Sequence, residues 1–320
     1  MGLPEVTVRQ AAIVGAADKV VAAQIRELLR FGVESIVLLA PAPPSLLISG
    51  ALPKPITIRW VEQPGNAEFD TTLGHVSHLL QDRFWLVNSK RAFDVNLAPL
   101  LIKAADANYG IQWGSEDAVW LINKLGMPWR TSGGTGRLLA CGEILPPRPA
   151  LFLDRDGTLN HDYGYVGSRA RWAWIEGAFD SIQQATHAGW HVFLVTNQSG
   201  IARGHYDEAT LAGLHRWMTD EVRRVGGTID DIRYCPFHPD GTMPCYRHDS
   251  LWRKPAPGMI LDLISRWKLD PARCLLVGDQ SSDMQAAQAA GIEGYLFQGG
   301  DLSRLIAPLL NARRSWSGLA

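Results

Sequence analysis

The sequence predicts two α/β domains, each built on a doubly wound parallel sheet with helices on both faces. Three observations support this prediction. Short apolar runs alternate with segments whose apolar residues recur at helical spacing, in both halves of the chain. A stretch rich in glycine and proline separates the halves. The chain has 320 residues, which is more than one domain usually contains.

The first half alternates between strand and helix patterns. Val20, Val21, Ile25 and Leu28 recur at helical spacing, and Gly32 follows as a stop signal, so a helix is predicted over 18–31. The apolar runs on either side favour strands. The strands expected in this half are 10–14, 35–39, 56–62 and 84–87, and a second helix is expected at 72–80.

Residues 131–149 contain the glycine cluster Thr131 to Gly136 and the run Pro146 to Pro149. Such clusters resist regular structure, so this segment is expected to be a linker. A Gly-Gly-x-Gly sequence can also form a phosphate loop, but no clear helix follows it here, and we favour the linker. The predicted domains are therefore 1–130 and 150–320, joined by residues 131–149.

The second half repeats the alternation of strands and helices. Leu211, Leu214 and Met218 lie on one helical stripe, which predicts a long amphipathic helix over 207–225 that Gly226 ends. The other expected elements are helices at 177–187, around 260–267 and at 283–290, and strands ending at Leu153, at 192–195 and at 274–277.

Two aspartates directly follow the first apolar run of this half. Successive side chains of an extended chain point to opposite faces, so Asp154 and Asp156 are expected to share a face while Arg155 points away. Gly157 then allows a sharp turn. Two neighbouring carboxylates are costly unless a cation accompanies them, which favours a metal site. The alternative is an ordinary turn after a strand, with Asp and Gly serving as turn formers.

Polar residues also follow the later strands of this half. In an open parallel sheet the ligand binds at the carboxyl ends of the strands, so these residues are expected to meet the aspartate pair. In order and separation they resemble the four motifs of the haloacid dehalogenase (HAD) superfamily of phosphohydrolases, over roughly the second half of the chain. The four segments are Asp154–Asn160, Thr196–Gly200, Arg253–Pro255 and Val277–Asp283.

This resemblance implies a phosphatase with no large cap domain and assigns roles to four residues. Asp154 would be the nucleophile that forms an aspartyl-phosphate, and Asp156 would be the general acid and then the general base. Thr196 and Lys254 would contact the phosphate. Each residue taken singly could be an ordinary cap or surface ion pair, but all of them in order favour the catalytic interpretation.

The resemblance also implies a magnesium site. Asp154, Asp279 and the backbone carbonyl of Asp156 would hold the ion, because Mg²⁺ prefers hard oxygen ligands. Asp283 is expected to orient the loop rather than to bind the metal.

The loops beside these motifs resemble those of the D-glycero-D-manno-heptose 1,7-bisphosphate phosphatases and the related histidinol-phosphate phosphatases. This resemblance implies a small sugar bisphosphate as the partner, gripped in part by Arg203 and Arg253 through their planar guanidinium groups. The alternatives are a histidinol-phosphate or polynucleotide 3'-phosphatase, or a scaffold protein without activity. The substrate-binding residues expected here are Asp162, Tyr165, Asn197, Gln198, Ser199, Arg203 and Arg253.

The sequence departs from that family at its zinc loop. The family pattern is Cys-x-His followed by Cys-x-Cys; here Cys235 is present, but Phe237, Ser250 and Trp252 occupy the other three places. A second set of cysteine and histidine residues could bind zinc tetrahedrally, because its residue types and their spacing suit that metal. We favour hydrophobic closure of the loop over that set, which consists of Cys235, His238, Cys245 and His248.

The first half resembles sugar-nucleotide nucleotidyltransferases along 10–14, 31–38, 83–88 and 93–97. Two features of that family are missing. Residues 15–18 lead straight into a helix where a glycine-rich triphosphate loop is required, and Lys90 stands where a metal-binding aspartate is required. We therefore expect a degenerate domain kept for packing, positioning or homodimer formation.

Composition excludes several classes of protein. The formal net charge is −1, so neither nucleic acid nor a membrane surface is an expected partner. The 4 cysteines form no disulfide framework pattern, and the start of the sequence lacks the pattern of a signal peptide. The expected location is the cytoplasm.

Overall fold

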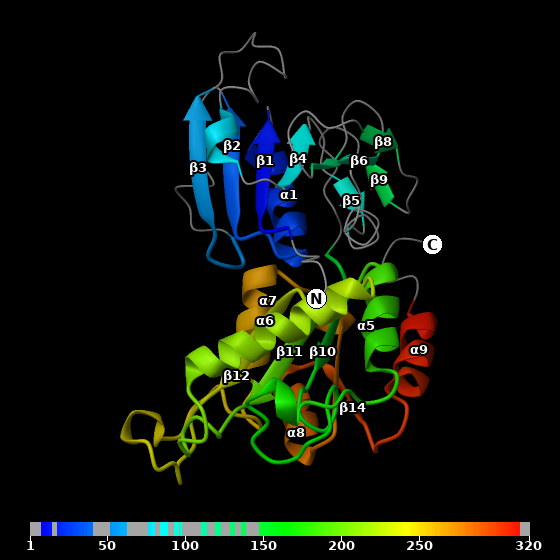
Figure 1. The fold of residues 1–320 in the computed structure, drawn as a ribbon. Helices are drawn as coiled ribbons and strands as arrows, with labels where there is room; N and C mark the ends of the chain where they lie inside the picture. Colours follow the sequence, from blue (N-terminus) through cyan, green and yellow to red (C-terminus); the bar gives the residue numbers. More distant parts are fainter. Residues whose placement is uncertain are drawn as a thin grey trace. The chain divides into compact units, whose positions relative to one another are not determined.

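The computed structural model divides the chain into two compact units, Met1–Leu145 and Pro146–Ala320. Each unit is described by itself below (Figure 1). The structure describes residues 8–14, 18–40, 52–62, 76–80, 84–88, 93–95, 97, 110–113, 119–122, 129–131, 136–138 and 147–313.

The first unit contains a seven-stranded sheet in the order β3-β2-β1-β4-β7-β6-β8. The neighbours β3, β2, β1 and β4 are parallel, whereas β7 is antiparallel to both β4 and β6. The predicted parallel sheet is thus confirmed, and it continues into a mixed edge. The strands are β1 (Gln10–Val14), β2 (Ser35–Ala40), β3 (Thr57–Glu62), β4 (Phe84–Asn88), β6 (Gly110–Trp113), β7 (Val119–Ile122) and β8 (Trp129–Thr131).

Helix α1 (Asp18–Arg30) confirms the first predicted helix. Its buried side chains, among them Val21, Ile25 and Leu28, form one core cluster with alternate residues of β1, β2 and β4. The other residues of those strands form a second cluster. Both faces of the sheet are therefore covered, as a parallel sheet requires.

Three expectations for the first unit are corrected or fall, wholly or in part, outside the described residues. Of the predicted helix 72–80, the structure describes 76–80, where η1 (Ser77–Leu79) is a 3₁₀ turn. In the expected linker, β9 (Gly136–Leu138) pairs with β5 (Phe93–Val95), because a partner strand can impose extended structure on a segment of weak local preference. Residues 15–17 and 89–90, on which the transferase comparison depends, lie outside the described residues.

The second unit contains a five-stranded, fully parallel sheet in the order β12-β11-β10-β13-β14. β10 lies at its centre, and its side chains are all buried. The strands are β10 (Ala150–Leu153), β11 (His191–Asn197), β12 (Asp231–Cys235), β13 (Cys274–Gly278) and β14 (Glu293–Leu296).

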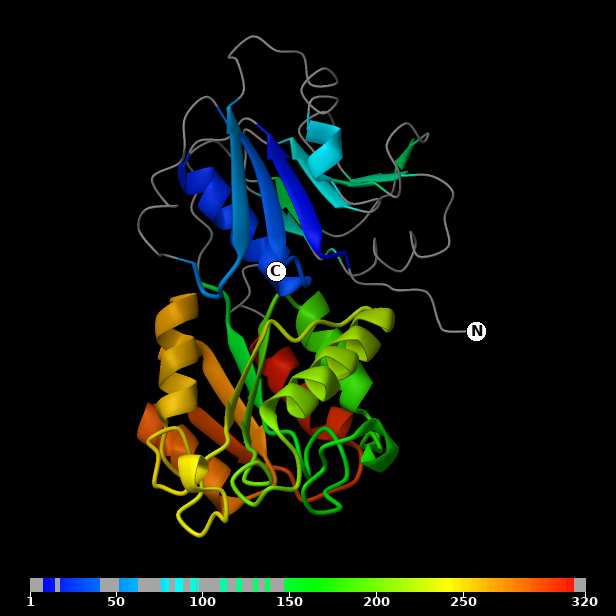
Figure 2. The same ribbon diagram turned by 60° about the vertical axis from the view of Figure 1, so that its left-hand side comes forward.

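Helices cover both faces of this second sheet, which confirms the predicted fold class. One core cluster joins the sheet to α5 (Ala178–His187), α6 (Glu208–Arg224) and α9 (Leu302–Ala312). A second cluster on the other face joins it to α7 (Gly258–Trp267) and α8 (Ser281–Ala290). Figure 2 shows α6 and α7 on opposite sides of the strands.

The sequence analysis did not predict β12, β14 or α9. β12 carries two charged residues and β14 contains a glycine, so neither shows an apolar run. α9 contains Pro308. In the part of the chain that the structure describes, no helix has the length and apolar character needed to cross a membrane. The three cysteines in that part are unpaired.

Candidate active site

The switch point of the second sheet brings three motifs together. The chain runs from β10 to β11 and β12 on one side, and then crosses to β13 on the other side of β10. Side chains that follow β10 and β13, or end β11, therefore meet at one crevice. Asp154 follows β10, Thr196 is the last residue but one of β11, and Asp279 follows β13.

Lys254 connects this crevice to two carboxylates. Its ammonium nitrogen Nζ lies 2.7 Å from Asp154 Oδ1 and 2.5 Å from Asp283 Oδ1. It also donates to the carbonyl oxygen of Val195 at 2.9 Å. Two carboxylate oxygens and one carbonyl oxygen thus surround the ammonium nitrogen. Lys254 is therefore fixed in place although it is almost completely buried.

Burial raises the pKa of Asp154 to about 7, against the opposing effect of the Lys254 ammonium. Burial alone would lower the pKa of Lys254, but Asp154 and Asp283 raise it above its ordinary value. The single positive charge of Lys254 thus faces two carboxylates, Asp154 and Asp283, and cannot neutralise both.

Asp154, Asp279 and Asp283 form a carboxylate cluster whose ligand oxygens lie within 4.8 Å of one another. Asp283 is already committed, because its Oδ2 accepts the Gln280 backbone N–H at 3.0 Å in a capping box and its Oδ1 pairs with Lys254. Asp154 and Asp279 therefore remain as the candidates for metal ligands. Hard oxygen donors with a surplus negative charge fit Mg²⁺, so the residues present suit the expected ion.

Gly157 leaves room for the Asp279 carboxylate. Its φ is +87°, and a Cβ at this position would lie 2.3 Å from Asp279 Oδ2. We therefore expect Gly157→Ala to displace that carboxylate and to raise the Mg²⁺ concentration for half-maximal activity about tenfold or more. The measurement is a magnesium titration of phosphate release.

Gly291→Ala is the matched control for that variant. Gly291 has a similar φ of +72°, but nothing lies within 4 Å of its missing Cβ. It should lose some stability through backbone strain and keep the parent magnesium dependence. Equal magnesium dependence in both variants would contradict the assignment of Asp279 as a ligand.

The Asp156 side chain is placed differently from the prediction. It was expected to share a face with Asp154 while Arg155 pointed away; instead Arg155 Nη2 donates to Asp156 Oδ1 and Oδ2 at 2.9 and 2.7 Å. Strand β10 ends at Leu153, so the alternation of the strand does not extend to residue 156. The Asp156 side chain is also absent from the carboxylate cluster; its backbone carbonyl stays a prediction as a metal ligand.

Two amides complete the hydrogen bonds to Asp156. Asn160 Nδ2 donates to Oδ1 at 3.0 Å, and Gln198 Nε2 donates to Oδ2 at 2.8 Å. Gln198 Nε2 also lies 2.8 Å from Thr196 Oγ1, and its Oε1 accepts from the Tyr206 hydroxyl at 2.6 Å. Burial raises the pKa of Tyr206 to about 12, so the phenol remains a donor. Gln198, expected to bind substrate, is thus occupied within the site.

Asn197, also expected to bind substrate, makes two hydrogen bonds to the backbone of Lys254. Its Nδ2 donates to the Lys254 carbonyl, and its Oδ1 accepts the Lys254 N–H, each at 3.0 Å. This pair of bonds connects the end of β11 to the loop that carries the lysine. Sequence reasoning missed the roles of Arg155, Asn160 and Tyr206 because no spacing pattern marks them.

The remaining predicted substrate residues lie on the loops around the crevice. Asp162 is exposed and accepts the Gly164 N–H at 2.8 Å. Tyr165 is 42% exposed and stacks on His205, with ring centroids 4.3 Å apart. Ser199 is half-buried in the loop after β11, where its carbonyl accepts the Arg203 N–H at 3.0 Å.

Arg203 and Arg253 approach each other across His238. Arg203 Nη2 lies 3.4 Å from His238 Nε2. Burial and the charge of Arg253, followed by that of Arg203, lower the pKa of His238, and burial lowers the pKa of Arg253. The two arginines thus lie near one imidazole, and their role in binding substrate stays a prediction.

The structure does not bring the alternative zinc set together. In the part of the chain that the structure describes, Cys235, His238, Cys245 and His248 form no group with converging ligand atoms. Cys235 is buried and Cys245 is exposed. The Phe237 ring occupies this loop instead. It packs against His248 at 4.2 Å between centroids and against Tyr246 at 5.9 Å.

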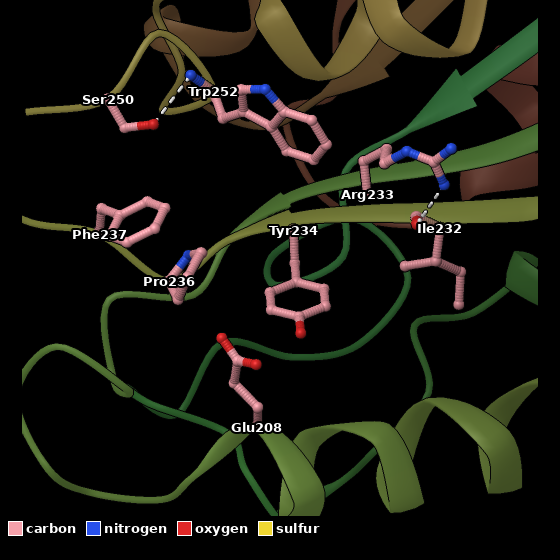
Figure 3. Close-up of a pocket in the computed structure, with 8 residues that line it drawn as sticks. All are labelled: Glu208, Ile232, Arg233, Tyr234, Pro236, Phe237, Ser250 and Trp252. Carbon is pink, nitrogen blue, oxygen red and sulfur yellow. Dashed lines mark hydrogen bonds between the residues drawn. The ribbon is translucent and has the colours of Figure 1, made fainter. Parts of the chain in front are cut away.

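A pocket of about 370 Å³ lies beside β12, where the aromatic side chains replace the family's zinc ligands. Phe237, Ser250 and Trp252 line it together with Tyr234 and Glu208. Figure 3 shows the Tyr234 hydroxyl pointing toward the Glu208 carboxylate. Its lining includes neither Asp154 nor Lys254, so the pocket is separate from the reacting groups.

Known proteins resemble this chain in the same region. A family model described as HAD-hydrolase-like matches residues 251–309. The D-glycero-beta-D-manno-heptose-1,7-bisphosphate 7-phosphatase of Rhodopseudomonas palustris is 48% identical over 165 residues, which are 52% of this chain and 92% of that protein. The enzyme of the same name from Yersinia pestis is 43% identical over 144 residues, which are 45% and 77% of the two proteins.

A solved structure agrees with the fold. A protein from Mesorhizobium loti, assigned as a HAD-like phosphatase, is 36% identical and has a TM-score of 0.50. The match covers 56% of this chain and 91% of that chain.

Proposed function

We propose that this chain, which belongs to the HAD-like hydrolase family, is a magnesium-dependent phosphatase acting on a sugar phosphate through an aspartyl-phosphate. The convergence of Asp154, Asp279 and Lys254 at one sheet edge is the observation that carries this proposal. The names of the relatives as phosphatases support it.

In the first half of the proposed reaction, a carboxylate oxygen of Asp154 attacks the phosphorus of the ester. A bond from Asp154 to phosphorus forms, and the bond from phosphorus to the sugar oxygen breaks. Asp156 gives its proton to the departing alkoxide. The Lys254 ammonium holds the attacking carboxylate in place at 2.7 Å.

In the second half, water attacks the phosphorus of the aspartyl-phosphate. Asp156, now ionised, takes a proton from that water, and the bond between phosphorus and Asp154 breaks. Inorganic phosphate leaves, and the Asp154 carboxylate and the Asp156 acid are regenerated. One residue serves both steps because it is protonated for the first and ionised for the second.

Asp154, Asp279 and the Asp156 carbonyl would hold Mg²⁺. When bound, the ion offsets negative charge on the phosphate oxygens and on the nucleophile. Thr196, at the end of β11, would add a hydroxyl contact to the phosphate. The surplus negative charge of the carboxylate cluster supports this assignment.

The substrate proposed is D-glycero-D-manno-heptose 1,7-bisphosphate, with loss of the phosphate at C7, on the route to nucleotide-activated heptose for lipopolysaccharide or other surface glycans. The relatives' names support this choice. The guanidinium groups of Arg203 and Arg253, which lie near His238, would supply charge for a second phosphate. Asp162 and Tyr165 lie on an exposed loop that would contact the sugar.

For the first unit we propose a degenerate nucleotidyltransferase-like domain that serves in packing, positioning or homodimer formation. The parallel strands β3, β2, β1 and β4 with α1 support its α/β architecture. The transferase chemistry is lost in this proposal because Lys90 replaces a metal-binding carboxylate.

A phosphate-release screen tests the function. The substrates are heptose 1,7-bisphosphate, histidinol phosphate and 3'-phosphorylated DNA, each with and without Mg²⁺. We expect release from the heptose bisphosphate at a kcat/KM at least about tenfold above the other two, because only that substrate offers a second phosphate monoester on a small sugar to the arginine pair. Greater release from histidinol phosphate or DNA would reassign the substrate, and no release from any of them would favour a scaffold.

A further inference from the structure

Arg155 is a buried cation beside the proposed acid and base. Its exposure is 0%. Besides the two contacts of Nη2, its Nε donates to Asp156 Oδ2 at 3.1 Å. A planar guanidinium matches both oxygens of a carboxylate at once, so this contact sets the direction of the Asp156 carboxyl plane.

The other contacts of Arg155 fix the guanidinium itself. Nη2 donates to the carbonyl oxygen of Val166 at 2.6 Å, and Nη1 lies 3.4 Å from His215 Nε2. The Trp172 ring packs against the guanidinium, with its centroid 5.8 Å from the central carbon. The group is thus held by α6 through His215 and by the loop that follows Asp156 through Val166.

His215 can take this contact only as a neutral imidazole. It is buried, and burial together with the charge of Arg155 lowers its pKa well below the ordinary value of 6.5. An arginine can only donate, so Nε2 must be the acceptor and Nδ1 must carry the proton. A neutral His215 therefore acts as an oriented acceptor for Arg155.

We propose that Arg155, itself oriented by His215, is a positioning residue that aims the Asp156 carboxyl at the leaving group. The inference rests on the proposed role of Asp156 as acid and base. A carboxyl group can turn about its Cβ–Cγ bond, and the two-point contact prevents this. The guanidinium also stabilises the negative charge that appears on Asp156 when its proton departs.

Comparing two leaving groups distinguishes a positioning role of Arg155 from a merely structural one, because loss of structure alone would not change their relative rates. A sugar alkoxide needs the proton from Asp156, whereas p-nitrophenolate leaves without one. The value of kcat/KM covers the steps up to departure of the leaving group, so it isolates proton donation. Its ratio between two substrates is independent of how much of the enzyme is folded.

The variant to test is Arg155→Lys, which keeps the charge but cannot span both carboxylate oxygens. We expect its kcat/KM for heptose 1,7-bisphosphate to fall about 10²-fold, and that for p-nitrophenyl phosphate to fall less than about threefold. Arg223→Lys is the matched control. Arg223 is also buried in this unit and pairs with Asp220 at 3.1 Å on α6, and its replacement should leave the ratio unchanged.

Asp156→Asn separates this inference from the proposed function. If it lowers the ratio of alkyl to aryl hydrolysis and Arg155→Lys does not, Asp156 is the acid and only the positioning role is wrong. If Asp156→Asn leaves the ratio unchanged, both the acid assignment and the positioning role are wrong. If the parent hydrolyses neither substrate, the proposed function fails, and the inference fails with it.

His215→Phe provides a second test that does not depend on the folding of Arg155→Lys. It removes the acceptor of Nη1, and we expect the ratio to fall about three- to tenfold. In the Arg155→Lys background it should cause no further fall, because the two residues act through one contact. An unchanged ratio in His215→Phe, or additive losses in the double variant, would overturn the linkage.

Discussion

Replacing Asp154 by asparagine is expected to lower kcat for heptose 1,7-bisphosphate by at least about 10⁴-fold. Asparagine has the same shape but is a poor nucleophile, and it cannot form the aspartyl-phosphate. The fold should persist, because burial already raises the pKa of the Asp154 carboxyl and disfavours its charged form. Steady-state phosphate release in saturating Mg²⁺ measures the loss, and circular dichroism reports the fold.

Asp180→Asn is the control for that experiment. Asp180 is an exposed residue in the first turn of α5, and its replacement should leave kcat unchanged. Hydrolysis by Asp154→Asn at the parent rate would show that another group attacks the phosphorus.

Replacing Lys254 by methionine is expected to destabilise the second unit by about 3–5 kcal/mol at pH 8. The ammonium pairs with two buried carboxylates, at 2.7 Å from Asp154 and 2.5 Å from Asp283. Its removal leaves both buried carboxylates without that counter-ion. Urea unfolding of the metal-free protein measures the change in free energy.

The loss in Lys254→Met should shrink as pH falls. Asp154 has an ordinary pKa of 3.8 and a folded value of about 7. A group whose folded pKa is raised contributes stability below its unfolded pKa, and this contribution is lost as pH rises through the folded pKa. Between pH 7 and pH 4 Asp154 becomes protonated, so its share of the unpaired charge disappears.

Arg266→Met is the contrast for the buried pair. Arg266 forms an exposed ion pair with Asp262 at 2.9 Å, and such surface pairs contribute at most about 1 kcal/mol. A loss in Lys254→Met no larger than in Arg266→Met, or one that does not depend on pH, would contradict the interpretation of Lys254 as the counter-ion of the nucleophile.

The meeting of Asp154, Thr196 and Asp279 could be predicted from the sequence because the parallel sheet gathers strand ends, whereas Lys254, in a loop between β12 and α7, was expected from the family resemblance. Asp154, Thr196 and Asp279 each stand directly after or at the end of an apolar run, and the switch point of the sheet is then their meeting place. Asp283 was expected to orient its loop, and its capping bond to Gln280 agrees with that.

The orientation of Asp156 could not be predicted in the same way. Alternation of side chains holds only while the strand continues, and β10 ends one residue before Asp154. Beyond that point the Asp156 side chain follows its hydrogen-bond partners. Those partners come from positions as distant as Gln198 on another loop, and a single sequence does not reveal such contacts.

The outer strands and the last helix were missed for a related reason. β12 and β14 are the edge strands, where one side faces fewer neighbours and the sequence need not be apolar throughout. β9 formed in the expected linker because β5 provides its hydrogen bonds. In such segments, pairing with a neighbouring strand has more influence on the secondary structure than the local sequence preference has.

The loop from Cys235 to Arg253 closes through aromatic packing on Phe237 and through main-chain bonds such as His238 N–H to the Tyr246 carbonyl at 3.1 Å. A loop that closes by side-chain packing needs only its own sequence, whereas a loop that closes around an ion also needs that ion. We therefore expect the packing around Phe237 to keep its shape when a chelator is added.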